Sequence, residues 1–139
     1  MQIRFTQEKL PASIEAQVEA GHAKYEKDKS VAINYQRFSL IAEEKGAVIG
    51  VLDGYTAYAE VYIDDLWVDE AFQNRGCATQ LIRQLEKQFA GSLFDYICLC
   101  TSEFQAPGFY EKCGFELEFK RSNKRNPKFN KYFFIKNLR

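Results

Sequence analysis

The segment AFQNRGCATQL, residues 71–81, combines residue types that favour anion binding at the start of a helix. Apolar residues recur at i, i+3, i+4, i+7 and i+11 from Ala78, which predicts an amphipathic helix beginning in this segment. The small residues Gly76 and Cys77 leave the backbone of its first turn accessible to a ligand, and no acidic side chain lies there. The first N–H groups of a helix have no partner within it, and the helix dipole adds partial positive charge. The segment therefore predicts a phosphate-binding turn.

Two common phosphate-binding motifs do not fit the sequence. The P-loop requires GxxxxGK[ST], which is absent, and the dinucleotide motif GxGxxG would have only Gly76 here. The turn therefore belongs to another class of phosphate site.

The elements around this turn predict a single α/β domain over residues 1–139. Strand, helix and strand across residues 57–101 predict a right-handed crossover with two parallel strands. The further elements complete an α/β sandwich on a mixed sheet. Expected strands are QIRFT at 2–6, two within 37–54 joined by a turn at 44–46, then 57–68, 95–101, 115–121 and 131–138. Expected helices cover 11–27, the segment from 76 to a stop at Gly91, and APGFYEKCG, ended by Gly114.

Composition and charge narrow the functional classes. Apolar residues make up 46% of the chain, which is typical of a globular protein, and no run approaches a membrane span. The first seventeen residues show no apolar signal-peptide core, so we expect a cytoplasmic protein with no membrane partner. Residues 1–70 carry seven basic and thirteen acidic side chains, and the remainder carries twelve and six. The basic second half suits an anionic ligand and the acidic first half suits a cationic one. Alternatively, the uneven distribution of charge arises by chance, and folding mixes the two signs over one surface.

The cysteines predict no metal site. Cys77, Cys98, Cys100 and Cys113 form no CxxC pair, and the one histidine, His22, is far away in sequence. Cys98 and Cys100 should share one face of a strand. We expect all four to be small buried hydrophobic residues in a reducing compartment.

Gln73-Asn74-Arg75-Gly76-Cys77-Ala78 resembles the acetyl-CoA motif (Q/R)-x-x-G-x-(G/A) of the GNAT superfamily of N-acetyltransferases. The second signature of that family is similar to APGFYEKCGFE, with Ala106, Phe109, Tyr110, Lys112, Gly114 and Phe115 at its fixed positions. YIDDLWVDE together with this segment also resembles a small bacterial subfamily. The motifs span about residues 57–116.

The resemblance implies a GNAT-like fold and acetyl-CoA as cosubstrate, with no metal. The fold would be a mixed, mostly antiparallel sheet of about six or seven strands, with a central splayed parallel pair and flanking helices. Pantetheine would lie between the splayed strands, and the pyrophosphate would lie on the turn. The implied cofactor-binding residues are Leu66, Trp67, Val68, Gln73, Asn74, Arg75, Gly76, Cys77, Ala78, Thr79 and Gln105.

The resemblance also implies transfer of an acetyl group to a primary amine through a tetrahedral intermediate. A carboxylate would take a proton from the amine, and we favour Asp64 and then Glu60. Strand alternation should put these two on one face and Asp65 on the other. Tyr110 would protonate the leaving thiolate. The alternatives are a solvated strand face or helix cap for the carboxylates and a core aromatic for Tyr110.

Other functions stay open on the sequence alone. These are a CoA-binding module without turnover and an acetyltransferase acting on a protein amine. KRSNKRNPKFNK, residues 120–131, could grip nucleic-acid phosphates, but a solvated hairpin loop is the favoured interpretation, so no nucleic-acid partner is expected. The preferred acceptor is a small cationic amine, and a homodimer is left open.

Overall fold

The computed structural model describes all residues 1–139, which form two units, Met1–Ile33 and Asn34–Arg139. The first unit contains helix α1, Ala12–Asp28, as the spacing of its apolar residues predicts. Residues 2–6 form no strand, so the expected strand QIRFT is wrong. An isolated strand leaves its backbone polar groups unpaired, and no neighbouring segment pairs with this one.

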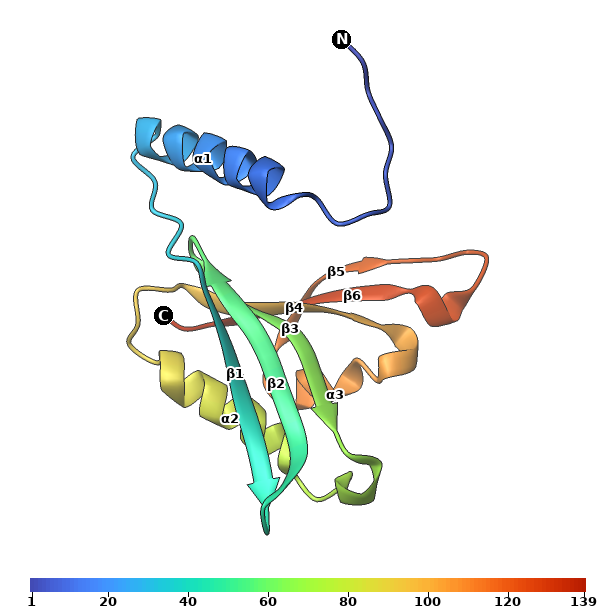
Figure 1. Cartoon of the computed structure of the whole chain (residues 1–139). Coiled ribbons are helices and arrows are strands. Elements are labelled where there is room, and N and C mark those ends of the chain that lie inside the picture. The colour runs from blue at the N-terminus through green and yellow to red at the C-terminus, as the bar shows by residue number, and fades with distance from the viewer. The chain divides into compact units, whose positions relative to one another are not determined.

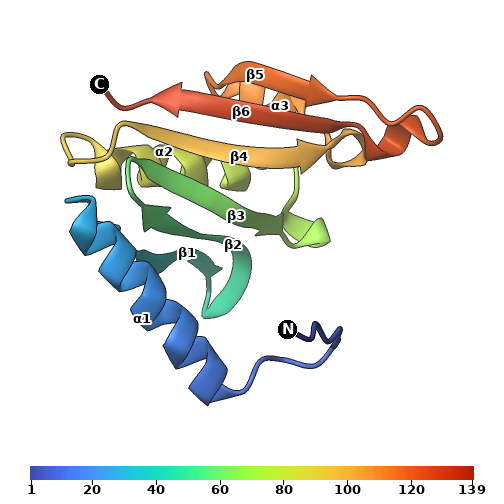
Figure 2. The same cartoon turned by 90° about the horizontal axis from the view of Figure 1, so that it is seen from above.

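The second unit is a six-stranded sheet with helices on one face (Figure 2). Its strands are β1 Gln36–Glu44, β2 Ala47–Ala57, β3 Glu60–Val68, β4 Tyr96–Ser102, β5 Glu116–Arg121 and β6 Lys131–Asn137. Its helices are α2 Cys77–Phe89 and the short α3 Gly108–Lys112 (Figure 1). The strand order is β1-β2-β3-β4-β6-β5, and only β3 and β4 are parallel. The predicted α/β fold with a central parallel pair is confirmed.

The core lies between the sheet and the two helices. Leu81, Ile82 and Leu85 of α2 are buried there, as the apolar spacing of that helix predicts. Tyr110 of α3 and Phe134 of β6 belong to the same buried cluster. One packed core thus fixes α2 and α3 against the same face of the sheet.

The hairpin between β2 and β3 differs from the expected elements. We expected a break near Tyr55 and a strand from Ala57, but β2 continues to Ala57 and β3 begins at Glu60. Tyr58 adopts a left-handed φ of 55° in the connecting turn. A tyrosine carries no turn signal comparable to glycine or asparagine, so the sequence pattern does not reveal this reversal.

A β-bulge interrupts the pairing of β2 with β3. Asp53 pairs with Asp65 but Gly54 pairs with Ile63, which leaves Asp64 as the extra residue. A Cβ at position 54 would overlap the carbonyl oxygen of Tyr62, so this close approach requires glycine. Because of the bulge, Ile63 before it and Leu66 after it contact the same core.

The basic segment 120–131 includes the end of β5, a hairpin loop over residues 122–130 and the first residue of β6, so the expected hairpin loop is present. Asparagine side chains order it: Asn123 accepts from the N–H groups of Arg125 and Asn126, and Asn130 accepts from that of Asn123 at 2.6 Å. A 3-10 turn, Pro127–Phe129, completes the loop. Among the helices, none combines the length and the apolar character needed to cross a bilayer.

Candidate active site

The turn between β3 and α2 presents unpaired backbone donors. The helix begins at Cys77, so Gly76 is its N-cap and not its first internal residue. Gly76 and Asn74 have left-handed φ angles of 82° and 61°, which glycine and asparagine tolerate best. The N–H groups of residues 74–79 have no hydrogen-bond partner within the protein, and the first turn of α2 contains no acidic residue. This geometry suits an anion.

Two contacts hold the turn in place. The Nε2 of Gln73 donates to the carbonyl of Val68 at 3.2 Å, which ties the turn back to the end of β3. On β2, a Cβ at Gly50 would lie 2.9 Å from the Sγ of Cys77, so the start of α2 packs directly on the strand. The donors are therefore positioned before any ligand arrives.

A cleft of about 420 Å³ opens in front of these donors. Most of the predicted cofactor-binding residues line it: Leu66, Val68, Gln73, Asn74, Gly76, Cys77, Ala78, Thr79 and Gln105. Tyr110 and Phe109 line its other wall, with Ala106 beside them. Phe72 also contributes, and no motif in the sequence marks it.

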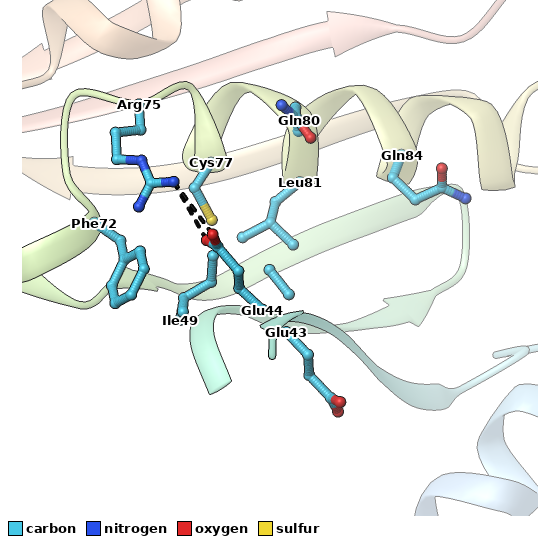
Figure 3. A pocket seen from close by; sticks show the side chains of 10 residues that line it. Glu43, Glu44, Ile49, Phe72, Arg75, Cys77, Gln80, Leu81 and Gln84 are labelled. Carbon is cyan, nitrogen blue, oxygen red and sulfur yellow. Dashed lines mark hydrogen bonds and ion pairs between the residues drawn. The ribbon is translucent and has the colours of Figure 1, made fainter. Parts of the chain in front are cut away.

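Trp67 and Arg75 do not line this cleft, although both were predicted to bind the cofactor. The indole of Trp67 is half-exposed on β3. The guanidinium of Arg75 pairs with Glu44 at 3.4 Å and lies 5.0 Å from the ring centroid of Phe72. Both Arg75 and Glu44 line another cavity, of about 500 Å³, between the β1–β2 hairpin and α2 (Figure 3), which shares Phe72 and Cys77 with the cleft.

The parallel strands separate at their carboxyl ends. Pairing runs from Glu60 with Tyr96 to Ile63 with Leu99 and then stops, although both strands continue. A cavity of about 90 Å³ occupies the opening. It shares Leu66, Gln105 and Tyr110 with the larger cleft, so the two spaces adjoin. The amide oxygen of Gln105 accepts from the N–H of Ser102 at 2.9 Å.

Tyr110 lies where the two spaces meet. The residue is 9% exposed, and its ring packs edge-on against Phe109 and Phe115 and at a tilt against Phe134. Burial raises the pKa of Tyr110 to about 12, and the charges of Cys113 and Asp65 add to the shift. The phenol is therefore protonated at neutral pH and packs in the core, and its role as a proton donor stays a prediction.

The three candidate carboxylates occupy different environments. Asp64 and Asp65 both line the small cavity, so the expectation that they face opposite sides is wrong, because the bulge interrupts the alternation there. Asp64 accepts from the guanidinium of Arg37 at 3.4 Å. Glu60 lies at the closed end of the parallel pair, lines neither space, and accepts from the thiol of Cys98 at 3.1 Å.

The cysteines are free and half-buried, rather than fully buried as predicted. Burial and the hydrogen bond to Glu60 raise the pKa of the Cys98 thiol, so this group stays protonated. Cys98 and Cys100 alternate with the buried residues of β4, as expected for one strand face. The side chains bring no group of three or more metal-ligating residues together.

Comparison with known proteins places this chain in a family. Residues 5–115 match the acetyltransferase (GNAT) family. Blasticidin-S acetyltransferase of Streptomyces morookaense is 33% identical over 78 residues, which are 53% of this chain and 55% of that protein, so the match spans about half of that relative.

Solved structures share the fold. An acetyltransferase from Bacillus cereus ATCC 14579 superposes with a TM-score of 0.77 at 23% identity, covering 96% of this chain and 97% of that one. An aminoglycoside 6'-N-acetyltransferase complexed with coenzyme A gives 0.63 at 17% identity, covering 74% and 73%. The match over residues 5–115 exceeds half the chain and includes the turn before α2 and Tyr110, so this chain belongs to the GNAT family of acetyltransferases.

Proposed function

We propose that this protein transfers an acetyl group from acetyl-CoA to the primary amine of a small cationic acceptor. The observation that carries the proposal is the junction of two spaces at Tyr110. The larger cleft offers unpaired backbone donors to a pyrophosphate, and the smaller cavity offers carboxylates to an amine. A thioester held at the junction would be accessible to both.

Donor binding would use the backbone of the turn and the free edge of β3. The N–H groups of residues 74–79 would bind the pyrophosphate oxygens. A Cβ at Gly76 would meet no atom within 4 Å, so the space beside the turn is open to a ligand. Leu66, Trp67 and Val68 pair with β2 but not with β4, which leaves their other main-chain groups for pantetheine. Acetyl-CoA supplies the activated acetyl group.

The preference for a cationic amine rests on the charges of the small cavity. Asp64 and Asp65 are its charged lining residues, and the rest of the lining is apolar or neutral. Two carboxylates attract an ammonium group and can accept its proton. The names of blasticidin-S acetyltransferase and of the aminoglycoside acetyltransferase indicate that relatives and structural neighbours act on small molecules.

Within this reaction we assign the base to Asp65, with Asp64 second. Asp64 is paired with Arg37, which also contacts Asp53 at 3.0 Å, and this pairing reduces its availability for a proton. Asp65 is the carboxylate whose charge reaches Tyr110. Glu60 has no part in the proposal because it lies away from both spaces. Tyr110 would give its proton to the leaving sulfur.

Calorimetry with CoA followed by a thiol-release assay tests the proposal. The assay uses acetyl-CoA with a panel of cationic small amines, neutral amines and peptides. We expect CoA binding and amine-dependent thiol release that is greatest for small cationic amines. Binding without release on any amine would indicate a CoA-binding module, and release with peptides alone would indicate a protein acetyltransferase. Absence of CoA binding would refute the proposal.

A further inference from the structure

A fourth cavity, of about 130 Å³, lies between α2 and the end of α3 and adjoins the 420 Å³ cleft. Thr79 lines both spaces. The other lining residues are Ile82, Arg83, Glu86, Lys112, Cys113 and Lys136. This volume is large enough to hold one phosphate group together with bound water.

The charges of this cavity favour an anion. Lys136 is already engaged, because it pairs with Glu86, donates to the carbonyl of Cys113 at 2.8 Å and lies 5.8 Å from the ring centroid of Phe115. Arg83 and Lys112 are exposed, and no ion pair or side-chain hydrogen bond in the structure uses either of them. With Glu86 neutralised by Lys136, two positive charges remain for a ligand.

The position of Arg83 relative to the phosphate turn limits what this ligand can be. Thr79 and Arg83 lie on one face of α2, and positions four apart are separated by about 6 Å along the axis. Arg83 and Cys113 line the same cavity, and the positive charge of Arg83 lowers the pKa of the Cys113 thiol, which burial and the charge of Glu86 raise. A ligand anchored on residues 74–79 therefore reaches Arg83 with a second anionic group one helical turn away.

We infer that Arg83 and Lys112 bind the 3'-phosphate of CoA and make the protein selective for CoA over its 3'-dephospho form. This inference rests on the proposed function, which places the pyrophosphate on the turn. In CoA the ribose joins the pyrophosphate to the 3'-phosphate, so the two anions are held at short range. Arg83 offers a planar fork of donors to phosphate, and Lys112 adds a point charge.

Calorimetry of the full chain with CoA and with 3'-dephospho-CoA tests the inference. We expect wild type to bind CoA at least tenfold more tightly, which corresponds to about 1.4 kcal/mol. Arg83→Ala should remove most of this difference by weakening CoA alone, and Lys112→Ala should remove part of it. Added salt should weaken CoA more than the dephospho form.

Lys87→Ala is the matched control, because it removes an exposed positive charge one turn further along α2, outside the cavity. It should leave both affinities unchanged. Equal wild-type affinity for the two ligands, or equal weakening of both by Arg83→Ala, would overturn the inference. If wild type bound neither ligand, that result would instead refute the proposed function.

Discussion

Asp65 of β3 and Tyr110 of α3 line one cavity in the opening between the parallel strands. Burial is the main cause of the raised pKa of Tyr110, and the negative charge of Asp65 contributes to it. A proton acceptor and a proton donor thus face the same space from different elements. In the proposed reaction one takes a proton from the amine and the other gives a proton to the sulfur.

Asp65→Asn should lower kcat/KM by roughly 10²-fold or more, because the amide cannot accept the proton of the attacking amine. The variant removes the charge with little change in shape, so acetyl-CoA affinity should stay near that of wild type. Steady-state kinetics with an acceptor identified in the amine panel gives the measurement. Asp64→Asn is the matched control and should lose less, since Arg37 already engages Asp64. A larger loss for Asp64→Asn would transfer the base role to Asp64.

Tyr110→Phe keeps the buried ring and removes the hydroxyl. Loss of general-acid help should reduce the rate of single-turnover acetyl transfer by roughly 10²–10⁴-fold, or about 3–5 kcal/mol of barrier. The Kd for acetyl-CoA should change little, because the proton is donated only as the C–S bond breaks. Tyr132→Phe, which alters a tyrosine outside both spaces, serves as control. Wild-type turnover by Tyr110→Phe would leave Tyr110 with a packing role only.

The raised pKa of Tyr110 also predicts a loss of stability in alkali. An unfolded tyrosine ionises near pH 10, whereas folded Tyr110 ionises near pH 12, so the unfolded chain loses its proton first. The contribution of protonated Tyr110 to the free energy of unfolding is complete below pH 10 and declines by up to about 2–3 kcal/mol as the pH rises to 12. Urea unfolding across this range should show a steeper decline for wild type than for Tyr110→Phe. Parallel declines in the two proteins would contradict the prediction, since other tyrosines contribute equally to both.

Gly76→Asp places a negative charge beside the unpaired donors of the turn. Acetyl-CoA affinity should fall by roughly tenfold or more, about 1.4 kcal/mol, as measured by calorimetry. Gly76→Ala separates the effect of the added charge from the effect of backbone strain. Alanine and aspartate are both unfavourable at the φ of 82°, but alanine adds no charge. The affinity of Gly76→Ala should lie between those of wild type and Gly76→Asp. Unchanged binding by a folded Gly76→Asp would exclude this turn as the pyrophosphate site.

Gly54→Ala should destabilise the protein by about 1–3 kcal/mol, because the new Cβ would overlap the Tyr62 carbonyl oxygen at the bulge. Gly21→Ala is the comparison, since a Cβ inside α1 meets nothing within 4 Å. Alanine at that helical position should be neutral or stabilise by about 0.5–1 kcal/mol. Urea unfolding gives both values. A neutral Gly54→Ala would show that the bulge relaxes easily.

Features encoded by local spacing could be predicted from the sequence. The helix after Gly76, its bare first turn and the short helix around Tyr110 each depend on residues close together in the chain. The family motifs lie in the same segments, so most of the residues that line the 420 Å³ cleft could be named in advance. Helical periodicity and cap preferences act over a few residues, so they can be recognised in the sequence without knowledge of the tertiary structure.

Long-range pairing decided the rest. The bulge at Asp64 depends on how β3 pairs with β2, and it put Asp64 and Asp65 in one cavity against the alternation of the strand. The pairing of Glu44 with Arg75 likewise joins separate elements and directs Arg75 away from the cleft. The sequence by itself determined which segments form the site, because local backbone preferences act within them. Only tertiary structure decided which side chains meet, because strand register and ion pairing join residues distant in sequence.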